Sequence, residues 1–197
     1  MKRLLVALVA AAALLAGCTS GSSSDDGGQA TGPAETGVQD VDTALQPCPE
    51  QTGDAVQAAD ALPALTFECI GGGSLDLSRA PGVPTVINVW GSWCGPCREE
   101  LPLVQELADA AGEQVQVLGV VTTDTLGAAD SFAADAGVTF PNAFDQQDDL
   151  LSDLGRRGAP FTFFVAADGT LAYTEAGAVS SYDELRQLVA DHLGVTL

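Results

Sequence analysis

Basic residues are scarce in this 197-residue chain, which has seven Lys and Arg residues against 27 Asp and Glu residues and a formal net charge of −20. Lys2 and Arg3 lie in a segment that we expect to be removed, and without them the mature chain carries −22. Nucleic acids and anionic membrane surfaces are bound by clustered Lys and Arg, so the composition argues against both as partners. The acidic residues are dispersed, which predicts a solvated surface. They include Asp124, Asp130, Asp135, Asp145 and Asp153.

The N-terminal apolar run is too short to cross a bilayer. It covers residues 4–16, which is 13 residues, whereas a spanning helix needs about 20. A short apolar run after two basic residues is typical of an export signal. The run ends in Leu15-Ala16-Gly17-Cys18, which resembles the lipobox of bacterial lipoproteins. This resemblance implies cleavage of residues 1–17, acylation of Cys18 and a lipid anchor at the extracytoplasmic face of the cell membrane. The alternative is an ordinary cleaved signal with a chance Cys.

Large apolar residues are almost missing between Cys18 and Pro47. A segment rich in Gly, Ser, Thr, Asp and Gln cannot bury enough surface to offset its chain entropy. We therefore predict a lipidated Cys and flexible linker over residues 18–47, followed by one folded domain over residues 48–197.

Four cysteines remain once Cys18 is set aside. Cys94 and Cys97 form a pair by their close spacing, which leaves Cys48 and Cys69 to each other in an oxidising compartment. We predict a structural disulfide between the latter two that closes a 22-residue loop and contributes about 3 kcal/mol. A zinc site is disfavoured because this second pair lacks close Cys-x-x-Cys spacing, so no metal site is expected.

Alternating strand and helix patterns fill the rest of the chain. A hairpin is predicted from strands at residues 65–70 and 74–77, joined by three glycines. The apolar runs at residues 84–90 and 115–121, with a helix between them that Gly112 stops, predict a right-handed βαβ unit. A second helix, a loop and a short helix follow, and then a hairpin and a capped C-terminal helix. These are expected at residues 126–136, 150–154, 161–174 and 182–193.

The Trp93-Cys94-Gly95-Pro96-Cys97 motif stands between a buried strand and a helix. At the helix N-terminus the unpaired N–H groups and the macrodipole stabilise a thiolate, so we expect a lowered pKa for Cys94. Cys97 lies on the same helical face and can resolve a mixed disulfide. Pro96 suits the first helical turn because its missing N–H would be unpaired there. An inert structural disulfide is the alternative.

The sequence Asn88-Val89-Trp90-Gly91-Ser92-Trp93-Cys94-Gly95-Pro96-Cys97-Arg98-Glu99-Glu100-Leu101-Pro102 resembles the TlpA/ResA branch of the thioredoxin superfamily. The resemblance implies an α/β fold, a thioredoxin-like three-layer sandwich with an N-terminal β-hairpin and a central helix and loop insertion. It also implies that Glu100 accepts the proton of Cys97, because Asn88 replaces the Asp that serves thioredoxin as a relay.

A second motif, Gly158-Ala159-Pro160-Phe161-Thr162, is similar to the family's loop in which a cis-Pro faces the dithiol. The resemblance implies that Ala159 and Pro160 bind an extended substrate segment. Trp93, Gly95 and Pro96 are expected to complete the contact surface.

The resemblance implies a thiol:disulfide oxidoreductase that needs no cofactor beyond its Cys94–Cys97 disulfide. We expect a reductant of exported Cys pairs such as those of apocytochrome c during cytochrome c maturation, supplied with electrons by a CcdA-like membrane partner. A DsbE-like oxidant that forms disulfides in exported proteins stays open. A Sco-like copper-binding assembly factor is a further alternative, although its Cys-x-x-x-Cys spacing and distant His differ from this chain, whose only histidine is His192.

Overall fold

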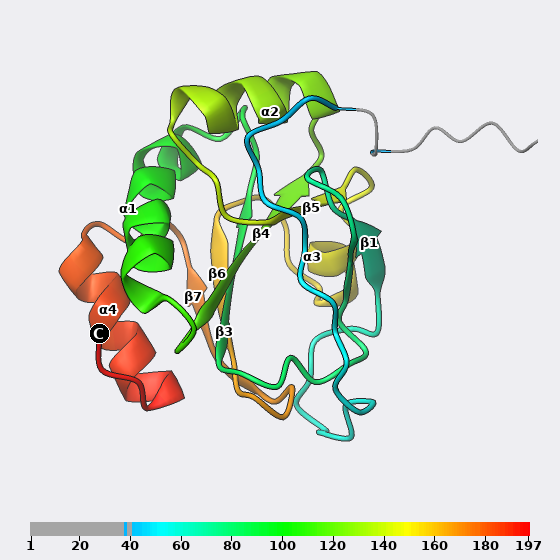
Figure 1. Ribbon diagram of the computed structural model, residues 1–197, viewed down its shortest axis with the longest axis vertical. Coiled ribbons are helices and arrows are strands. Elements are labelled where there is room, and N and C mark those ends of the chain that lie inside the picture. The colour runs from blue at the N-terminus through cyan, green and yellow to red at the C-terminus, as the bar shows by residue number, and fades with distance from the viewer. Residues whose placement is uncertain (1–37, 39–40) are drawn as a thin grey trace, which may run out of the picture. The chain divides into compact units, whose positions relative to one another are not determined.

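The computed structural model describes Val38 and residues 41–197, and its centre is a mixed five-stranded sheet in the order β5-β4-β3-β6-β7 (Figure 1). The first three of these strands in space are mutually parallel, whereas β6 and β7 run antiparallel to their neighbours. The strands are β3 (Thr85–Trp90), β4 (Gln116–Thr122), β5 (Asn142–Asp145), β6 (Phe161–Val165) and β7 (Leu171–Ala176). The expected signal segment, Cys18 and most of the predicted linker lie outside the described residues.

One face of the sheet is covered by three helices, α1 (Gly95–Ala111), α2 (Leu126–Asp135) and α4 (Tyr182–Leu193). Every residue of β3 is buried, because its alternate side chains enter cores on both faces of the sheet. On the helical face Trp90 meets Phe132 of α2, with ring centroids 5.9 Å apart, and packs in the same cluster as Leu101 of α1. The βαβ unit thereby places the start of α1 at the carboxyl edge of the sheet.

The other face carries the hairpin of β1 (Thr66–Glu68) and β2 (Ser74–Asp76) together with the short helix α3 (Asp149–Asp153). Phe67 from the hairpin and Leu150 from α3 belong to the same buried cluster as Phe163 of β6. The molecule is therefore a three-layer sandwich, and the predicted thioredoxin-like fold is confirmed.

The strand β5 stands where the sequence suggested only a loop. Its four residues, Asn-Ala-Phe-Asp, lack a strand-like apolar run, yet they pair in parallel with β4. Asn142 is buried there, and its Oδ1 accepts the Trp90 Nε1–H at 2.7 Å. Tertiary pairing has overridden weak local propensity at this edge of the sheet.

The predicted boundary of the folded domain at residue 48 is wrong by several residues. Leu45 is only 5% exposed and belongs to the core on the helical face, together with Val38. The Gln46 N–H donates to the Thr139 carbonyl at 2.9 Å. A few apolar side chains spaced along a polar segment are enough to dock it, although they are too sparse to indicate structure in the sequence.

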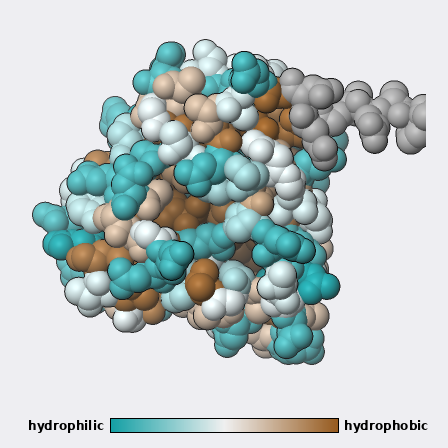
Figure 2. All heavy atoms as spheres, viewed as in Figure 1, coloured by the Kyte–Doolittle hydropathy of each residue, from teal (hydrophilic) through white to brown (hydrophobic). Residues whose placement is uncertain are grey.

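The surface is mainly hydrophilic on the face shown in Figure 2, with small hydrophobic patches between polar residues. Two acidic residues expected at the solvated surface are instead buried, Asp124 at 9% and Asp145 at 2% exposure. Asp145 accepts the backbone N–H groups of Asp149 and Leu150 at the start of α3, and burial raises the pKa of its carboxyl. Across the part of the chain that the structure describes, no helix has the length and apolar character to span a bilayer.

Candidate active site

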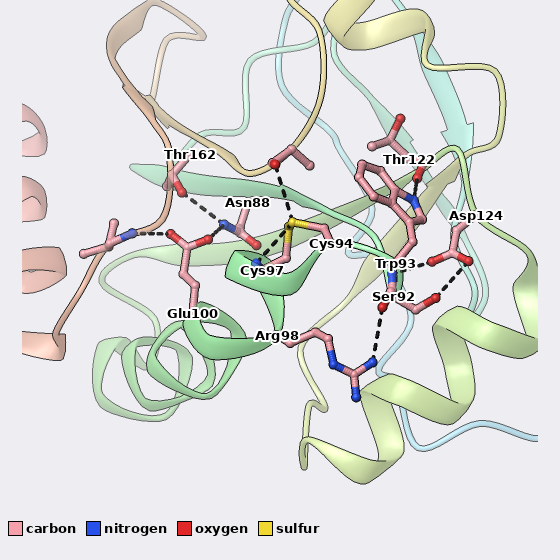
Figure 3. The surroundings of a disulfide bond; sticks show 12 residues. Asn88, Ser92, Trp93, Cys94, Cys97, Arg98, Glu100, Thr122, Asp124 and Thr162 are labelled. Atoms are coloured by element: carbon pink, nitrogen blue, oxygen red, sulfur yellow. Dashed lines mark hydrogen bonds between the residues drawn. A yellow bond between two sulfur atoms is a disulfide. The ribbon is translucent and has the colours of Figure 1, made fainter.

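Cys94 and Cys97 form a disulfide where β3 gives way to α1 (Figure 3). Cys94 is the N-cap residue of α1 with an extended backbone, and its Sγ accepts the Cys97 N–H at 3.2 Å. One of the unpaired donors at the helix N-terminus is thus aimed at this sulfur. Cys97 is fully buried, whereas Cys94 keeps a small exposed fraction of 3%. The geometry favours Cys94 as the attacking sulfur and Cys97 as the resolving one.

The loop before β6 faces the dithiol from the neighbouring strand. The Ala159–Pro160 peptide bond is cis, and the Ala159 carbonyl oxygen lies 3.4 Å from Cys94 Sγ. In the reduced protein a Cys94 thiol can donate to this oxygen. Gly95 and Pro96 are exposed beside the dithiol, and the Trp93 side chain is 52% exposed. The structure therefore brings the five residues proposed for substrate contact to one edge of the sheet.

Glu100 lies one helical turn after Cys97 and is completely buried. Its Oε1 accepts the Val179 N–H and its Oε2 accepts the Asn88 Nδ2–H, both at 3.0 Å. Burial raises the pKa of the Glu100 carboxyl above its ordinary value, and these two hydrogen bonds only partly oppose the rise. A buried carboxyl with a raised pKa is a candidate for exchanging a proton with a neighbouring group.

Asn88 connects Glu100 to the sheet. Its Nδ2 also donates to Thr162 Oγ1 at 3.0 Å, while its buried Oδ1 has no hydrogen-bond partner among the described residues. A half-turn of this amide would present Oδ1 to Glu100, which is the acceptor that a protonated carboxyl needs. The Asn88 amide can therefore form a hydrogen bond with Glu100 in either protonation state of that carboxyl. Sequence reasoning assigned Asn88 no proton transfer, and the structure gives it this supporting position.

Ser92 and Asp124 form a contact beside the dithiol that sequence reasoning missed. Two hydrogen bonds join Ser92 to the Asp124 carboxylate, and Arg98 of α1 donates to the Ser92 carbonyl. In Figure 3 this group lies to the right of the dithiol and the Glu100 network lies to its left. No local pattern marks Asp124, because the partner residues are 32 positions apart in the chain.

The second cysteine pair lies in the other core. Cys48 and Cys69 form a disulfide that ties the N-terminal segment to the end of the β1–β2 hairpin. His192 of α4 stacks on Tyr173 of β7 with ring centroids 3.9 Å apart. Among residues 38 and 41–197, no group of three or more His, Cys, Asp and Glu side chains is placed to hold a metal ion.

The chain is similar to known proteins in sequence and in fold. The Redoxin family matches residues 57–190 of the chain. The thiol-disulfide oxidoreductase ResA of Geobacillus kaustophilus is 30% identical over 135 residues, which cover 68% of this chain and 78% of that protein.

Two solved structures resemble the described fold. A secreted Mycobacterium tuberculosis disulfide oxidoreductase homologous to E. coli DsbE has 27% identity and a TM-score of 0.58, over 65% of this chain and 96% of its own. The exposed lipoprotein thioredoxin Etrx1 of Streptococcus pneumoniae also has 27% identity, with a TM-score of 0.54 over 64% of this chain and 98% of its own.

Proposed function

This chain belongs to the Redoxin family and is a thiol:disulfide oxidoreductase of the ResA/DsbE type; from that premise we propose that it reduces the Cys pairs of exported proteins outside the cytoplasm. The observation that carries the proposal is the position of Cys94 at the N-cap of α1, with Cys97 in the first turn and the Ala159 carbonyl opposite. The sulfurs themselves carry the electrons, so the reaction requires no further redox group.

Catalysis begins with Cys94 as the thiolate, which the Cys97 N–H and the positive end of the α1 macrodipole stabilise. It attacks one sulfur of a substrate disulfide; a new S–S bond forms, the substrate S–S bond breaks, and one substrate sulfur leaves as a thiolate. The Cys97 thiolate then attacks Cys94 Sγ and releases the second substrate sulfur. The substrate has gained two electrons, and the protein has been oxidised to the Cys94–Cys97 disulfide.

Glu100 accepts the proton of Cys97 in this scheme. Both residues project from one side of α1, into an interior that excludes water. The raised pKa of Glu100 brings its basicity closer to that of a thiol, which makes the transfer less uphill than it would be to an ordinary carboxylate. Asn88 supplies a donor to the ionised carboxylate and, after rotation, an acceptor to the protonated one.

An extended substrate segment is held by the cis-Pro loop and the exposed rim of the dithiol. Ala159 offers its backbone beside Cys94, as strand addition requires, and the exposed faces of Trp93, Gly95 and Pro96 border it. Backbone recognition of this kind tolerates different side chains. It suits a protein that serves several exported substrates, apocytochrome c among them.

We assign the direction of electron flow on the Gly95-Pro96 pair, which resembles that of reducing thioredoxins. The DsbE homology of the Mycobacterium tuberculosis relative supports the oxidant as the second candidate. A measured reduction potential separates the two. We expect a value near the roughly −270 mV of thioredoxin, and one near the about −120 mV of a strong oxidant would reverse the assignment.

Substrates are identified by trapping. In Cys97→Ala the resolving sulfur is missing, so mixed disulfides on Cys94 should accumulate in cells and be released by dithiothreitol. Cys94→Ala/Cys97→Ala is the matched control and should trap nothing. Recovery of apocytochrome c and a CcdA-like membrane protein is the expected result. Equal recovery with the double variant would refute Cys94 as the nucleophile.

We propose that lipid on Cys18 anchors the protein at the extracytoplasmic face of the cell membrane, a proposal that the lipobox resemblance of Leu15-Ala16-Gly17-Cys18 supports. The pneumococcal relative is described as an exposed lipoprotein, which supports this placement. Cys18→Ala should move the protein from the membrane fraction to the soluble exported fraction and abolish labelling by a palmitate analogue. Unchanged labelling would overturn the assignment.

A further inference from the structure

Every polar group of Ser92, the residue two positions before Cys94, is held by a neighbour. Its N–H donates to Asp124 Oδ2 at 2.6 Å, and its hydroxyl donates to Asp124 Oδ1 at 3.1 Å. Its carbonyl accepts the Arg98 Nη1–H at 3.2 Å, and the Arg98 guanidinium stacks on Phe132 of α2 at 4.2 Å from the ring centroid. Because the Asp124 carboxylate accepts two donors from Ser92, it fixes both the position and the orientation of Ser92.

The next residue, Trp93, is held by Thr122, two positions before Asp124. Its indole Nε1–H donates to the Thr122 carbonyl at 3.3 Å, while half of the side chain stays exposed. The indole folds back over Gly91, where a Cβ atom would collide with Nε1. One edge of the ring is therefore anchored, as Figure 3 shows, and the side chain of this residue next to Cys94 is 52% exposed.

Residues 122–125, which we call the brace, are themselves locked at the end of β4. Thr123 has a φ of 48°, a conformation that β-branched residues rarely adopt and that surrounding contacts must maintain. The Thr123 N–H donates to the Asp145 carbonyl at 3.2 Å, and the Thr122 hydroxyl donates to Asp148 at 2.8 Å. Asp124 Oδ1 also accepts the Thr125 N–H at 2.8 Å, where α2 begins. Strain retained by this many contacts is typical of functional loops.

The brace holds the residues before Cys94 and makes no hydrogen bond with the sulfurs within the described part of the chain. The contacts of Cys94 Sγ come from the Cys97 N–H inside α1 and from Ala159. We propose that Asp124 is a positioning residue that sets the orientation of Trp93 as a plane for polypeptide substrates, separately from the thiol chemistry. This inference rests on the proposed thiol:disulfide exchange and assigns a specificity determinant to it.

The test separates substrate recognition from chemistry. Asp124→Ala is assayed with insulin, a polypeptide disulfide, and with dithiodipyridine, a small uncharged disulfide that does not need the Trp93 plane. We expect KM for insulin to rise about ten-fold with kcat nearly unchanged, the size of one lost interface anchor. The rate with dithiodipyridine should stay within about two-fold of wild type, since thiolate stabilisation within α1 is retained. Asp135→Ala is the matched control, because Asp135 is an exposed acidic residue at the far end of α2, the helix that begins just after the brace.

Trp93 gives a second readout. Trp90 is fully buried, so acrylamide quenching of fluorescence reports chiefly on Trp93 and should increase in Asp124→Ala. In a Trp93→Phe background, Asp124→Ala should cause no further rise in KM, because both changes remove the same plane. Asp124→Asn, which keeps the shape and one acceptor oxygen, should fall between wild type and Asp124→Ala, and it replaces that variant if the alanine protein does not fold.

Three outcomes would overturn the positioning role. These are an equal loss with insulin and dithiodipyridine, an unchanged KM for insulin, and additive effects of the Trp93 and Asp124 substitutions. Failure of the proposed function gives a different result, since the wild-type protein would then react with neither disulfide.

Discussion

Replacing Glu100 by Gln tests the proton transfer directly, because it removes a charge and leaves the shape of the side chain. The Gln carbonyl can keep the Val179 N–H, and rotation of the Asn88 amide lets its free Oδ1 accept from the new NH₂ group. Two hydrogen bonds to a charged acceptor are worth about 1.5–3 kcal/mol each. The effective penalty for burying an ion is several kcal/mol, which these two hydrogen bonds offset in part. We expect the free energy of unfolding at pH 7 to change by less than about 2 kcal/mol.

The sign of the pH dependence follows from the raised pKa of Glu100. In the folded protein this carboxyl holds its proton to higher pH than in the unfolded chain, where its ordinary value is 4.5. Stability from this group is therefore fully present below that value and is lost as pH rises through the folded pKa. Across this window wild type loses about 1.4 kcal/mol per pH unit relative to Glu100→Gln. Comparing the two variants cancels the similar contribution of Asp145.

The kinetic effect should be confined to the resolving step. General base catalysis contributes about 10²- to 10⁴-fold, so we expect release of the second substrate thiol to slow by at least about 100-fold. Alkylation of Cys94 in the reduced protein should change little. Single-turnover reaction with an insulin disulfide, quenched with acid and resolved by mass, separates the two steps. Glu99→Gln is the control, since Glu99 is the exposed neighbour on the same helix. Equal rates for Glu100→Gln and wild type, with parallel stability curves from pH 4.5 upward, would refute the role.

Two further predictions concern stability. Replacing Cys48 and Cys69 together by Ala should lower the free energy of unfolding by about 3 kcal/mol, which is the chain-entropy contribution of a loop this size. The reduction potential of the Cys94–Cys97 pair should stay unchanged. Chemical denaturation measures the first quantity and redox titration the second. Leu45→Ala should lower the free energy of unfolding by about 2–5 kcal/mol, because Leu45 is part of the core; a chemical denaturation curve that matches wild type would show that it is not.

The sequence predicts the elements that combine strong periodicity with clear end signals. In β3 a largely apolar, β-branched run is followed by the dithiol motif and a helix, and the structure places all three as expected. Loops and edge strands leave weaker signals in the sequence. The strand β5 has no local signal, because its formation depends on pairing with β4 and on the Asn142 contact with Trp90.

The burial of Glu100 has a signal in the helix phase. The buried residues of α1 recur at helical spacing as Cys97, Glu100, Leu101, Val104 and Leu107, so Glu100 falls on the apolar stripe and Glu99 falls beside it. The identity of its partners has no such signal. Asn88, Thr162 and Val179 come from two strands and a later loop. The register of β3 with β6 pairs Asn88 with Thr162, and Val179 reaches Glu100 from the loop before α4.

The contact between Ser92 and Asp124 shows why a sequence that identifies the catalytic sulfurs can still leave part of their surroundings unassigned. Asp124 is one of many acidic residues, and nothing nearby distinguishes it from Asp130 or Asp135. What distinguishes it is the parallel register that aligns Trp90 with Val121, so that both strands end at one edge of the sheet. The residues that follow must then meet there, because the carboxyl ends of parallel strands open into the same crevice. Given that register, an acidic residue three positions past Val121 faces the loop before Cys94. The role of Asp124 therefore depends on the pairing of β3 with β4, and the residues next to Asp124 in the sequence do not indicate it.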